Sequence, residues 1–258
     1  MKLTVRFLGT GTSIGVPVIG CSCEVCASTD LRDARTRTAI LVQSATTNVV
    51  IDTGPDFRQQ ALRAKLARLD AVLLTHEHRD HVGGLDDIRA YNIWQQAAMP
   101  IYASEAVQAV IKRDYHYAFG ENPYPGAPRF DLKQIDKNSV FRIGDLQFQA
   151  FEVLHGTLPI LCFRCGDFTY ITDCKTMSDE EFEKIKNTKT LVINALHHRK
   201  HPAHFNVEEA VDFINRVKPE RAYLIHCSHL IGKYADMLSM LPENVQLSYD
   251  GLEIQFDY

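Results

Sequence analysis

Residues 71–84 read AVLLTHEHRDHVGG, and this stretch decides the fold. The apolar run at 71–74 is typical of a buried strand. Three histidines, a glutamate and an aspartate follow within 75–81, and two glycines at 83–84 let the chain turn away. Helical metal pairs stand four residues apart, whereas residues two apart do not share a helix face. The spacing therefore predicts a loop that curls around an ion at a strand end, not a charged helix surface.

Composition narrows the class of protein. The chain has 258 residues and a net charge of −4, so it offers room for a large α/β domain but no basic field for nucleic acid. Its apolar runs are strand-sized, which excludes a membrane span. Arg6 interrupts the first apolar run, which predicts a strand and not a signal peptide. We therefore expect a cytoplasmic protein, whose seven cysteines serve metal ligation or burial and not disulfides.

Strand and helix patterns alternate along the chain. The patterns predict strands at 3–9, 38–43, 48–54, 71–75, 146–155, 160–165, 168–173, 191–196 and 221–227, and helices at 57–66, 85–96, 178–187 and 207–218. Capping boxes are expected at Ser178 with Glu181 and at Asn206 with Glu209. Asp250–Gly251 predicts a final hairpin. This mixture favours a two-sheet α/β arrangement over a purely parallel sheet.

The motif that follows the strand at 71–75 also carries a family resemblance. His76-x-His78-x-Asp80-His81 resembles the signature of the metallo-β-lactamase superfamily. The resemblance implies an αββα four-layer sandwich, formed here by one domain over 1–258, with a two-metal hydrolytic site at its edge. It also requires a later histidine, aspartate and histidine near strand ends. The matching residues are His155 after FEVL, Asp173 after FTYIT and His226 after AYLI.

The resemblance assigns a role to each of these side chains. One metal would be held by His76, His78 and His155, the second by Asp80, His81 and His226, and Asp173 would bridge them. Asp80 would thereby be essential to catalysis. The ions would be zinc or manganese, and the hydroxide they bind would attack a phosphodiester, although the superfamily also cleaves thioesters and lactams. Asp52 is either an orienting group behind the ligands or a strand-end turn residue.

A second candidate metal site lies near the N-terminus. Cys21-x-Cys23-x-x-Cys26 supplies three thiolates, but structural zinc needs four ligands. From spacing alone, the fourth could be Cys227 or His229. The run LGTGTSIGVPVIGCSCEVC is similar to the PhnP-like branch of phosphoribosyl cyclic phosphodiesterases, and this resemblance implies His229.

The same branch resemblance implies a substrate and a further residue. The substrate would be a small cyclic phosphodiester such as phosphoribosyl 1,2-cyclic phosphate, and the protein would be a homodimer. His204 would act at the scissile phosphate, while His197, His198 and His201 are read as a solvated loop. The segment 114–130, dense in aromatic residues, glycine and proline, is either a plain connection or a lid inserted over the site.

Two other functions share this fold. An RNA-processing nuclease similar to tRNase Z usually has a long basic arm, which this sequence lacks. A non-hydrolytic cofactor-biosynthesis protein departs from the H-x-H-x-D-H pattern, which is complete here. The Gly9-x-Gly11 pattern lacks the spacing of a dinucleotide fingerprint. Cys162 and Cys165 would point to opposite faces of a strand, and Cys174 has no assigned role.

Overall fold

The computed structural model describes residues 2–120 and 123–258, in which two seven-stranded sheets face each other. The first sheet has the order β14 (Glu253–Asp257), β1 (Lys2–Gly9), β2 (Ala39–Gln43), β3 (Asn48–Ile51), β4 (Ala71–Leu73), β5 (Met99–Ala103), β6 (Phe130–Gln134). The second has the order β13 (Val245–Leu247), β12 (Arg221–Ile225), β11 (Thr190–Asn194), β10 (Phe168–Tyr170), β9 (Leu158–Cys165), β8 (Leu146–His155), β7 (Val140–Ile143).

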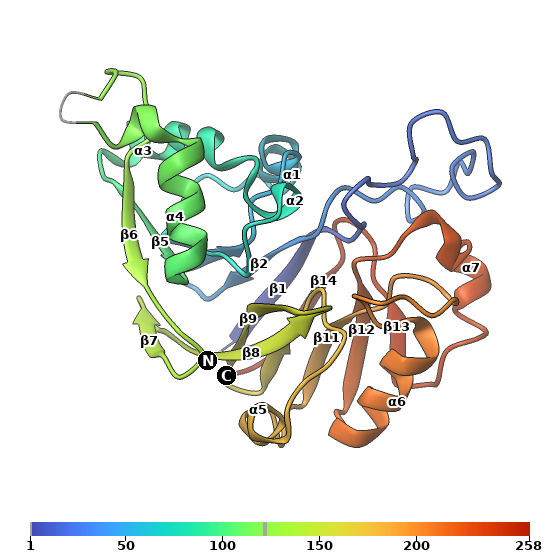
Figure 1. Cartoon of the computed structure of the whole chain (residues 1–258). Helices are drawn as coiled ribbons and strands as arrows, with labels where there is room; N and C mark the ends of the chain where they lie inside the picture. Colours follow the sequence, from blue (N-terminus) through green and yellow to red (C-terminus); the bar gives the residue numbers. More distant parts are fainter. Residues whose placement is uncertain (1, 121–122) are drawn as a thin grey trace.

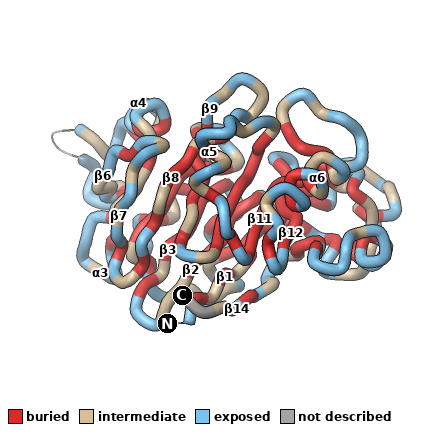
Figure 2. The backbone as a smooth tube through the Cα atoms, turned by 90° about the horizontal axis from the view of Figure 1, so that it is seen from below, coloured by how far each residue is buried: buried red, intermediate tan, exposed pale blue. Residues whose placement is uncertain are grey.

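Strand alternation divides the buried residues between two faces of each sheet. In β9, Phe163 and Cys165 belong to the core between the sheets, whereas Ile160 and Cys162 face the helices. The predicted opposite orientation of the two cysteines is therefore confirmed. Large aromatic side chains such as Phe148 fill the space between the sheets. Figure 2 shows the buried strands enclosed by exposed helices and loops.

Helices cover the outer face of each sheet, which confirms the expected four-layer αββα sandwich (Figure 1). The first sheet carries α1 (Phe57–Arg63), α2 (Arg79–Val82), α3 (Arg89–Gln95) and α4 (Glu105–Asp114). The second carries α5 (Asp179–Lys184), α6 (Val207–Val217) and α7 (Tyr234–Met237). Three short 3-10 turns complete the elements of the described residues: η1 (Leu85–Ile88), η2 (His116–Ala118) and η3 (His229–Ile231). No described helix combines the length and apolar character needed to cross a membrane.

One of the two predicted capping boxes is complete. The Asn206 side chain accepts from the Glu209 amide at 2.8 Å, and Glu209 accepts from the Asn206 amide at 3.0 Å. The prediction for α5 is half right, because Ser178 accepts from the Glu181 amide while the Glu181 carboxylate turns away. That carboxylate instead accepts from the Glu152 amide at 2.9 Å, so a long-range contact with β8 replaces the local one.

The predicted hairpin at the end of the chain is wrong. β13 and β14 lie in different sheets, and β14 pairs with β1. Asp250 belongs to the crossing between the sheets, where its carboxylate accepts from the amides of Thr10 at 2.9 Å and Thr36 at 2.8 Å. An Asp-Gly pair favours a tight turn locally, but these long-range bonds decide where the flanking strands go.

The start of the 114–130 segment is fastened to the first sheet's half of the molecule. The Asp114 carboxylate pairs with Arg79 at 3.0 Å, and the Tyr115 hydroxyl donates to the Val82 carbonyl at 2.9 Å. The segment then runs to β6 at an outer corner of the molecule (Figure 1). Residues 121 and 122 of the predicted lid segment lie outside the described residues.

Candidate metal centre

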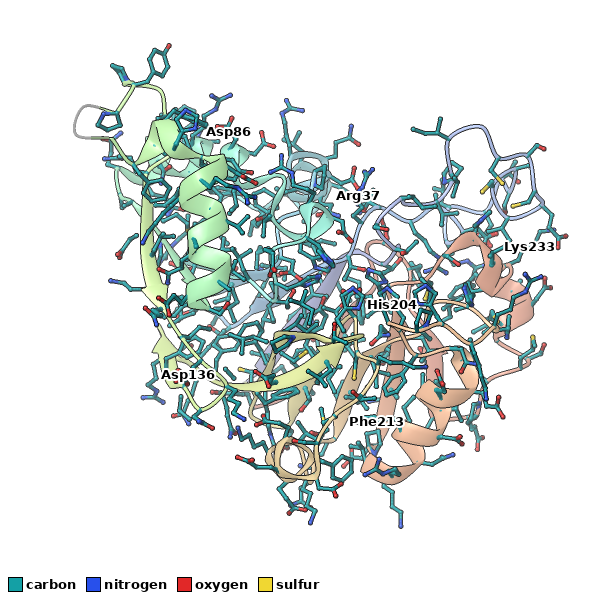
Figure 3. The ribbon with its side chains drawn as sticks, in the orientation of Figure 1. Arg37, Asp86, Asp136, His204, Phe213 and Lys233 are labelled. Atoms are coloured by element: carbon teal, nitrogen blue, oxygen red, sulfur yellow. The ribbon has the colours of Figure 1, made fainter. Side chains whose placement is uncertain are left out.

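The predicted ligands follow strands whose carboxyl ends meet at one edge of the sandwich. β3 and β4 run parallel, as do β10, β11 and β12, so the turns that follow them open on the same side. A bond from the Leu161 amide to the Thr75 carbonyl, at 3.0 Å, ties the two sheets together beside this edge. Figure 3 places His204 at this meeting point, near the middle of the molecule.

Three histidines form the first ligand group. One ring nitrogen from each of His76, His78 and His155 lies within 4.8 Å of the others. The His76 Nε2 and His78 Nδ1 atoms are 3.0 Å apart. His155 Nδ1 lies 2.9 Å from the Ala203 carbonyl, which leaves its Nε2 free for a metal. The Thr75 hydroxyl lies 3.0 Å from His76 Nδ1 and fixes that ring in the same way.

Asp80, His81 and His226 form the second group of donors, again within 4.8 Å of one another. His81 Nε2 lies 3.3 Å from Asp80 Oδ2, and His226 Nε2 lies 3.7 Å from the same oxygen. On the other side of the ring, His81 Nδ1 lies 2.7 Å from the buried Asp52 carboxylate. That carboxylate also accepts from the Thr75 amide at 2.9 Å. Asp52 therefore orients a ligand and also holds a loop.

Asp173 lies between the two groups. Its Oδ2 atom is 3.1 Å from His81 Nε2, and its Oδ1 atom is 3.0 Å from His226 Nε2. Asp173 also groups with His76, so its donors face both sets of ligands. His204 Nδ1 lies 3.2 Å from Asp173 Oδ1, and this residue is 8% exposed. The structure thus brings all seven predicted ligands and His204 together.

Burial and neighbouring charges shift the pKa values of these groups strongly. Burial and the nearby His81 lower the pKa of His76 well below its ordinary value. Burial alone would lower the pKa of His226, but Asp173 outweighs it and raises that pKa to about 9. Burial opposes ionisation of Asp173, yet His226 and His81 hold its pKa well below the usual range. Burial and His226 lower the pKa of His204 to about 3.

The donor set fits divalent cations. Among the described residues, His81 Nε2 and His204 Nδ1 are buried without a hydrogen-bond partner, although carboxylate oxygens lie close to both. Imidazole nitrogens that converge with carboxylates are the ligands that zinc and manganese accept. An ion beside His81 Nε2 would partner that nitrogen and offset the buried negative charge.

Backbone strain gathers at the same edge. Asp52, Asp173 and His226 have φ angles of 67°, 50° and 58°, a left-handed conformation that residues with a Cβ rarely adopt. Such strain persists where surrounding structure over-determines it, often at active sites. Gly54 has a different constraint, since a Cβ there would lie 2.0 Å from the Asp80 carbonyl oxygen. Only glycine lets the two loops approach so closely.

The fourth donor of the cysteine cluster is His229, which lies far along the chain from the three cysteines. His229 Nδ1 lies 3.4 Å from Cys21 Sγ, 3.3 Å from Cys23 Sγ and 3.5 Å from Cys26 Sγ. Cys227, the alternative that spacing left open, is buried in the core beneath α7. The Cys26 amide donates to Cys23 Sγ and, with His229, lowers the pKa of Cys23 to about 6. Three thiolates and one imidazole give four donors, the set that a tetrahedral structural zinc site requires.

The remaining histidines do not join a donor group among the described residues. His198 Nε2 donates to the Ile231 carbonyl at 2.9 Å, and His201 Nδ1 accepts from the Ala203 amide at 3.2 Å. Sequence reasoning missed Thr75, which contacts both Asp52 and His76. Its place between the strand and the first histidine was the available signal. It also missed the contact of the Ala203 carbonyl with His155, because no pattern in the sequence marks a backbone carbonyl as a ligand's partner.

Comparison with known proteins adds three findings. The family model described as "Beta-lactamase superfamily domain" matches residues 47–227. A crystal structure of "a New Diphosphatase from the PhnP Family" superposes with a TM-score of 0.93 and 34% identity, covering 99% of this chain and 98% of that one. An "Octanoyltransferase" of Porphyromonas gingivalis is 44% identical over 252 residues, 97% of this chain and 51% of the relative.

A "Ribonuclease Z" of Methanopyrus kandleri is 35% identical over 168 residues, which are 63% of this chain and 50% of that relative. The chain therefore spans about half the length of the curated relatives it matches.

Proposed function

The chain belongs to the PhnP-like branch of the metallo-β-lactamase superfamily of hydrolases, and from this premise we propose that it is a metal-dependent phosphodiesterase. Its substrates would be small phosphodiesters, with cyclic phosphates such as phosphoribosyl 1,2-cyclic phosphate as the leading class. The observation that carries the proposal is the position of His204. Its imidazole lies 3.2 Å from Asp173, which faces both ligand groups, and this position supports a contact with a phosphoryl group bound there.

Two divalent ions, zinc or manganese, would complete the site. His76, His78 and His155 would hold one, and Asp80, His81 and His226 the other, with Asp173 facing both. Such a pair lowers the pKa of water and stabilises charge on phosphate oxygens. The positive charge of two such ions exceeds the negative charge of the ligand carboxylates, so the site attracts an anionic substrate. The cysteine cluster would hold a third, structural zinc.

The chain's own side chains and backbone position the ligands. Asp52 holds His81 through Nδ1, and the Ala203 carbonyl holds His155 through Nδ1, so each ring presents its Nε2 atom to the site. His204 lies beside Asp173 and, with its pKa lowered to about 3, is a neutral imidazole that can donate an N–H hydrogen bond to an oxygen of the phosphate. Fixing these donors before substrate arrives avoids reorganisation during the reaction.

A diphosphate is the second candidate substrate. The similar solved structure carries the name diphosphatase, and a phosphoanhydride and a phosphodiester both lose an oxygen leaving group from phosphorus. The two classes therefore require the same ligand arrangement. They differ in where the second phosphate must be held, which a substrate panel can measure.

Acyl transfer has less support. The octanoyltransferase relative is about twice as long as this chain, which matches 51% of it. A thiol nucleophile needs a lowered pKa and access to solvent. Burial raises the pKa of Cys165 to about 12 and of Cys227 to about 11, and the pKa values of Cys162 and Cys174 are also raised. Cys21, Cys23 and Cys26 stand in the zinc-type cluster.

The test is a panel of three substrates with zinc or manganese added: an aryl phosphodiester, the matching phosphomonoester and a doubly substituted diphosphate. The proposal expects turnover of the diester well above that of the monoester. Higher turnover of the diphosphate would favour the second candidate. No turnover of any phosphate, together with cleavage of a thioester, would overturn both. None of the seven cysteines forms a disulfide, and we place the protein in the cytoplasm as part of the proposal.

A further inference from the structure

The candidate catalytic ligand His226 and the cysteine-cluster ligand His229 stand on one tight turn. β12 ends at Ile225, and η3 begins at His229, so two residues separate the ligands. His226 Nε2 lies 3.0 Å from Asp173 Oδ1, on the side of the dinuclear site. His229 Nδ1 lies 3.3 Å from Cys23 Sγ, on the side of the cysteine cluster. A movement of this turn would therefore disturb both sites.

The turn is strained where it carries the catalytic ligand. His226 has a φ angle of 58°, which places its Cβ against the neighbouring carbonyl. A residue with a side chain keeps this conformation only while contacts on both sides of it hold the backbone. On the N-terminal side, β12 is paired with β11 and β13. The C-terminal side has no strand, so its restraints come from individual contacts.

Backbone bonds hold the two middle residues of the turn. The Cys227 amide donates to the Thr10 carbonyl at 2.9 Å, and the Cys227 carbonyl accepts from the Thr12 amide at 3.1 Å. The Ser228 amide donates to the Leu196 carbonyl at 2.9 Å. After Ser228 the restraint passes to side chains. The His229 imidazole enters the cysteine cluster, whose loop is continuous with the segment that carries Thr10 and Thr12.

We propose that His229 is a positioning residue for the dinuclear site: its ligation with the three cysteines holds the left-handed turn at His226 and so fixes that ligand. The inference rests on the proposed metal centres, and it adds an energetic coupling between them. Such coupling is reciprocal. Zinc in the cysteine cluster should raise the affinity of the dinuclear site for metal, and metal in the dinuclear site should slow the loss of zinc from the cluster.

The test measures metal affinity and needs no substrate. The protein is prepared with zinc in the cysteine cluster and the dinuclear site emptied by a chelator, and Mn²⁺ is then titrated in. Thiolates select zinc, whereas imidazole and carboxylate accept manganese, so the two sites can be loaded separately. His229→Ala should weaken Mn²⁺ binding by about tenfold or more, as loss of an orienting contact does. His229→Cys should restore the affinity, because four thiolates also complete a zinc site.

Lys233→Ala is the matched control. Lys233 pairs with Glu24 at 3.1 Å and joins the same two segments as His229, but both groups are exposed and neither is a ligand. This variant should bind Mn²⁺ like the wild type. Wild-type affinity in His229→Ala, with its cysteine cluster shown to be empty by metal analysis, would overturn the coupling.

A measurement on the wild type covers the case in which His229→Ala does not fold. An organomercurial reagent can extract zinc from the partly exposed Cys21, Cys23 and Cys26, because the other four cysteines are at most 1% exposed. Extraction should weaken Mn²⁺ binding, and adding thiol and zinc should restore it. Unchanged Mn²⁺ affinity after extraction would again reject the coupling. A wild type that binds no Mn²⁺ or zinc outside the cluster would reject the proposed dinuclear site itself, and the coupling with it.

Discussion

His81 Nδ1 and Asp52 Oδ2 lie 2.7 Å apart, and both side chains are fully buried. The contact fixes the tautomer and the orientation of the imidazole, so that Nε2 faces Asp80 and Asp173. Burial would lower the pKa of His81, but Asp52, Asp173 and Asp80 outweigh it and raise that pKa well above its ordinary value. A carboxylate behind a ligand histidine is a frequent device of metal sites, because it makes the ring a stronger donor.

Asp52→Asn should therefore weaken metal binding without removing a ligand. We expect a loss of roughly 10- to 100-fold in affinity for zinc or manganese, measured by competition with a chromophoric chelator. Asp70→Asn is the control, since Asp70 precedes β4 at the opposite end and accepts from the Asn48 amide at 2.8 Å. Equal metal affinities in the two variants would show that Asp52 does no more than hold its loop.

Asp80→Ala removes a carboxylate that approaches both His81 and His226. Turnover of an aryl phosphodiester should disappear while the circular dichroism spectrum stays that of the wild type, because the side chain is only partly buried. Glu77→Ala is a control from the same loop, since Glu77 joins no donor group among the described residues. Full activity in Asp80→Ala would contradict the ligand assignment.

His204→Gln tests the residue beside Asp173. A glutamine amide cannot occupy the position of the imidazole N–H, so kcat should fall roughly 100-fold or more if His204 stabilises charge on the phosphate. The bound metal, measured by elemental analysis, should not change. His197 lies on the same loop but outside the donor groups, so the His197→Gln variant should keep wild-type activity. A variant of His204 that loses metal in proportion to activity would make this residue a ligand instead.

Gly54→Ala tests the close approach of two loops. The added Cβ would meet the Asp80 carbonyl oxygen at 2.0 Å, which requires the metal loop to move. We expect a lower melting temperature together with weaker metal binding. Gly120→Ala is the control, since a Cβ there meets nothing within 4 Å. Wild-type metal affinity in Gly54→Ala would mean that the loops can separate without disturbing the ligands.

Glu209→Gln tests the pH dependence of stability. Burial opposes the ionisation of Glu209, but Lys175, at 2.8 Å, and the Asn206 amide outweigh it and lower the pKa of Glu209 below 4.5. A carboxyl group whose pKa is lower in the folded state stabilises the fold above its unfolded pKa, and this contribution is lost as the pH falls. The variant should therefore melt earlier than the wild type at neutral pH, and the difference should shrink below about pH 4.

Glu208→Gln is the matched control, because Glu208 is an exposed neighbour in the first turn of the same helix. Its melting temperature should follow that of the wild type at each pH. A difference between wild type and Glu209→Gln that stays constant down to acid pH would assign the effect to lost packing and not to charge.

Local patterns in the sequence carried much of this account. The spacing of His76, His78, Asp80 and His81 reports loop geometry within a few residues, and apolar alternation reports which strand face is buried. The strands predicted at 146–155 and 160–165 correspond to β8 and β9 for that reason. The fold class followed from the mixture of such elements together with the resemblance that the motif carries.

The errors lie where a local preference competes with a distant partner. Glu181 has the right spacing for a capping box, but the Glu152 amide offers its carboxylate a bond across to β8. Asp250–Gly251 has the composition of a hairpin turn, yet Thr10 and Thr36 bind the carboxylate and lead the chain between the sheets. Each local signal was present, and a contact far away in the sequence outweighed it.

The sequence by itself determined which kinds of side chain the site would have, because ligand chemistry and short spacings depend only on neighbouring residues. Spacing alone left open which of them meet, and the tertiary structure decided it. It placed His229 and not Cys227 beside Cys23, and it set His204 against Asp173. These pairs are far apart along the chain, so their contact depends on how two sheets pack face to face and bring their strand ends to one edge.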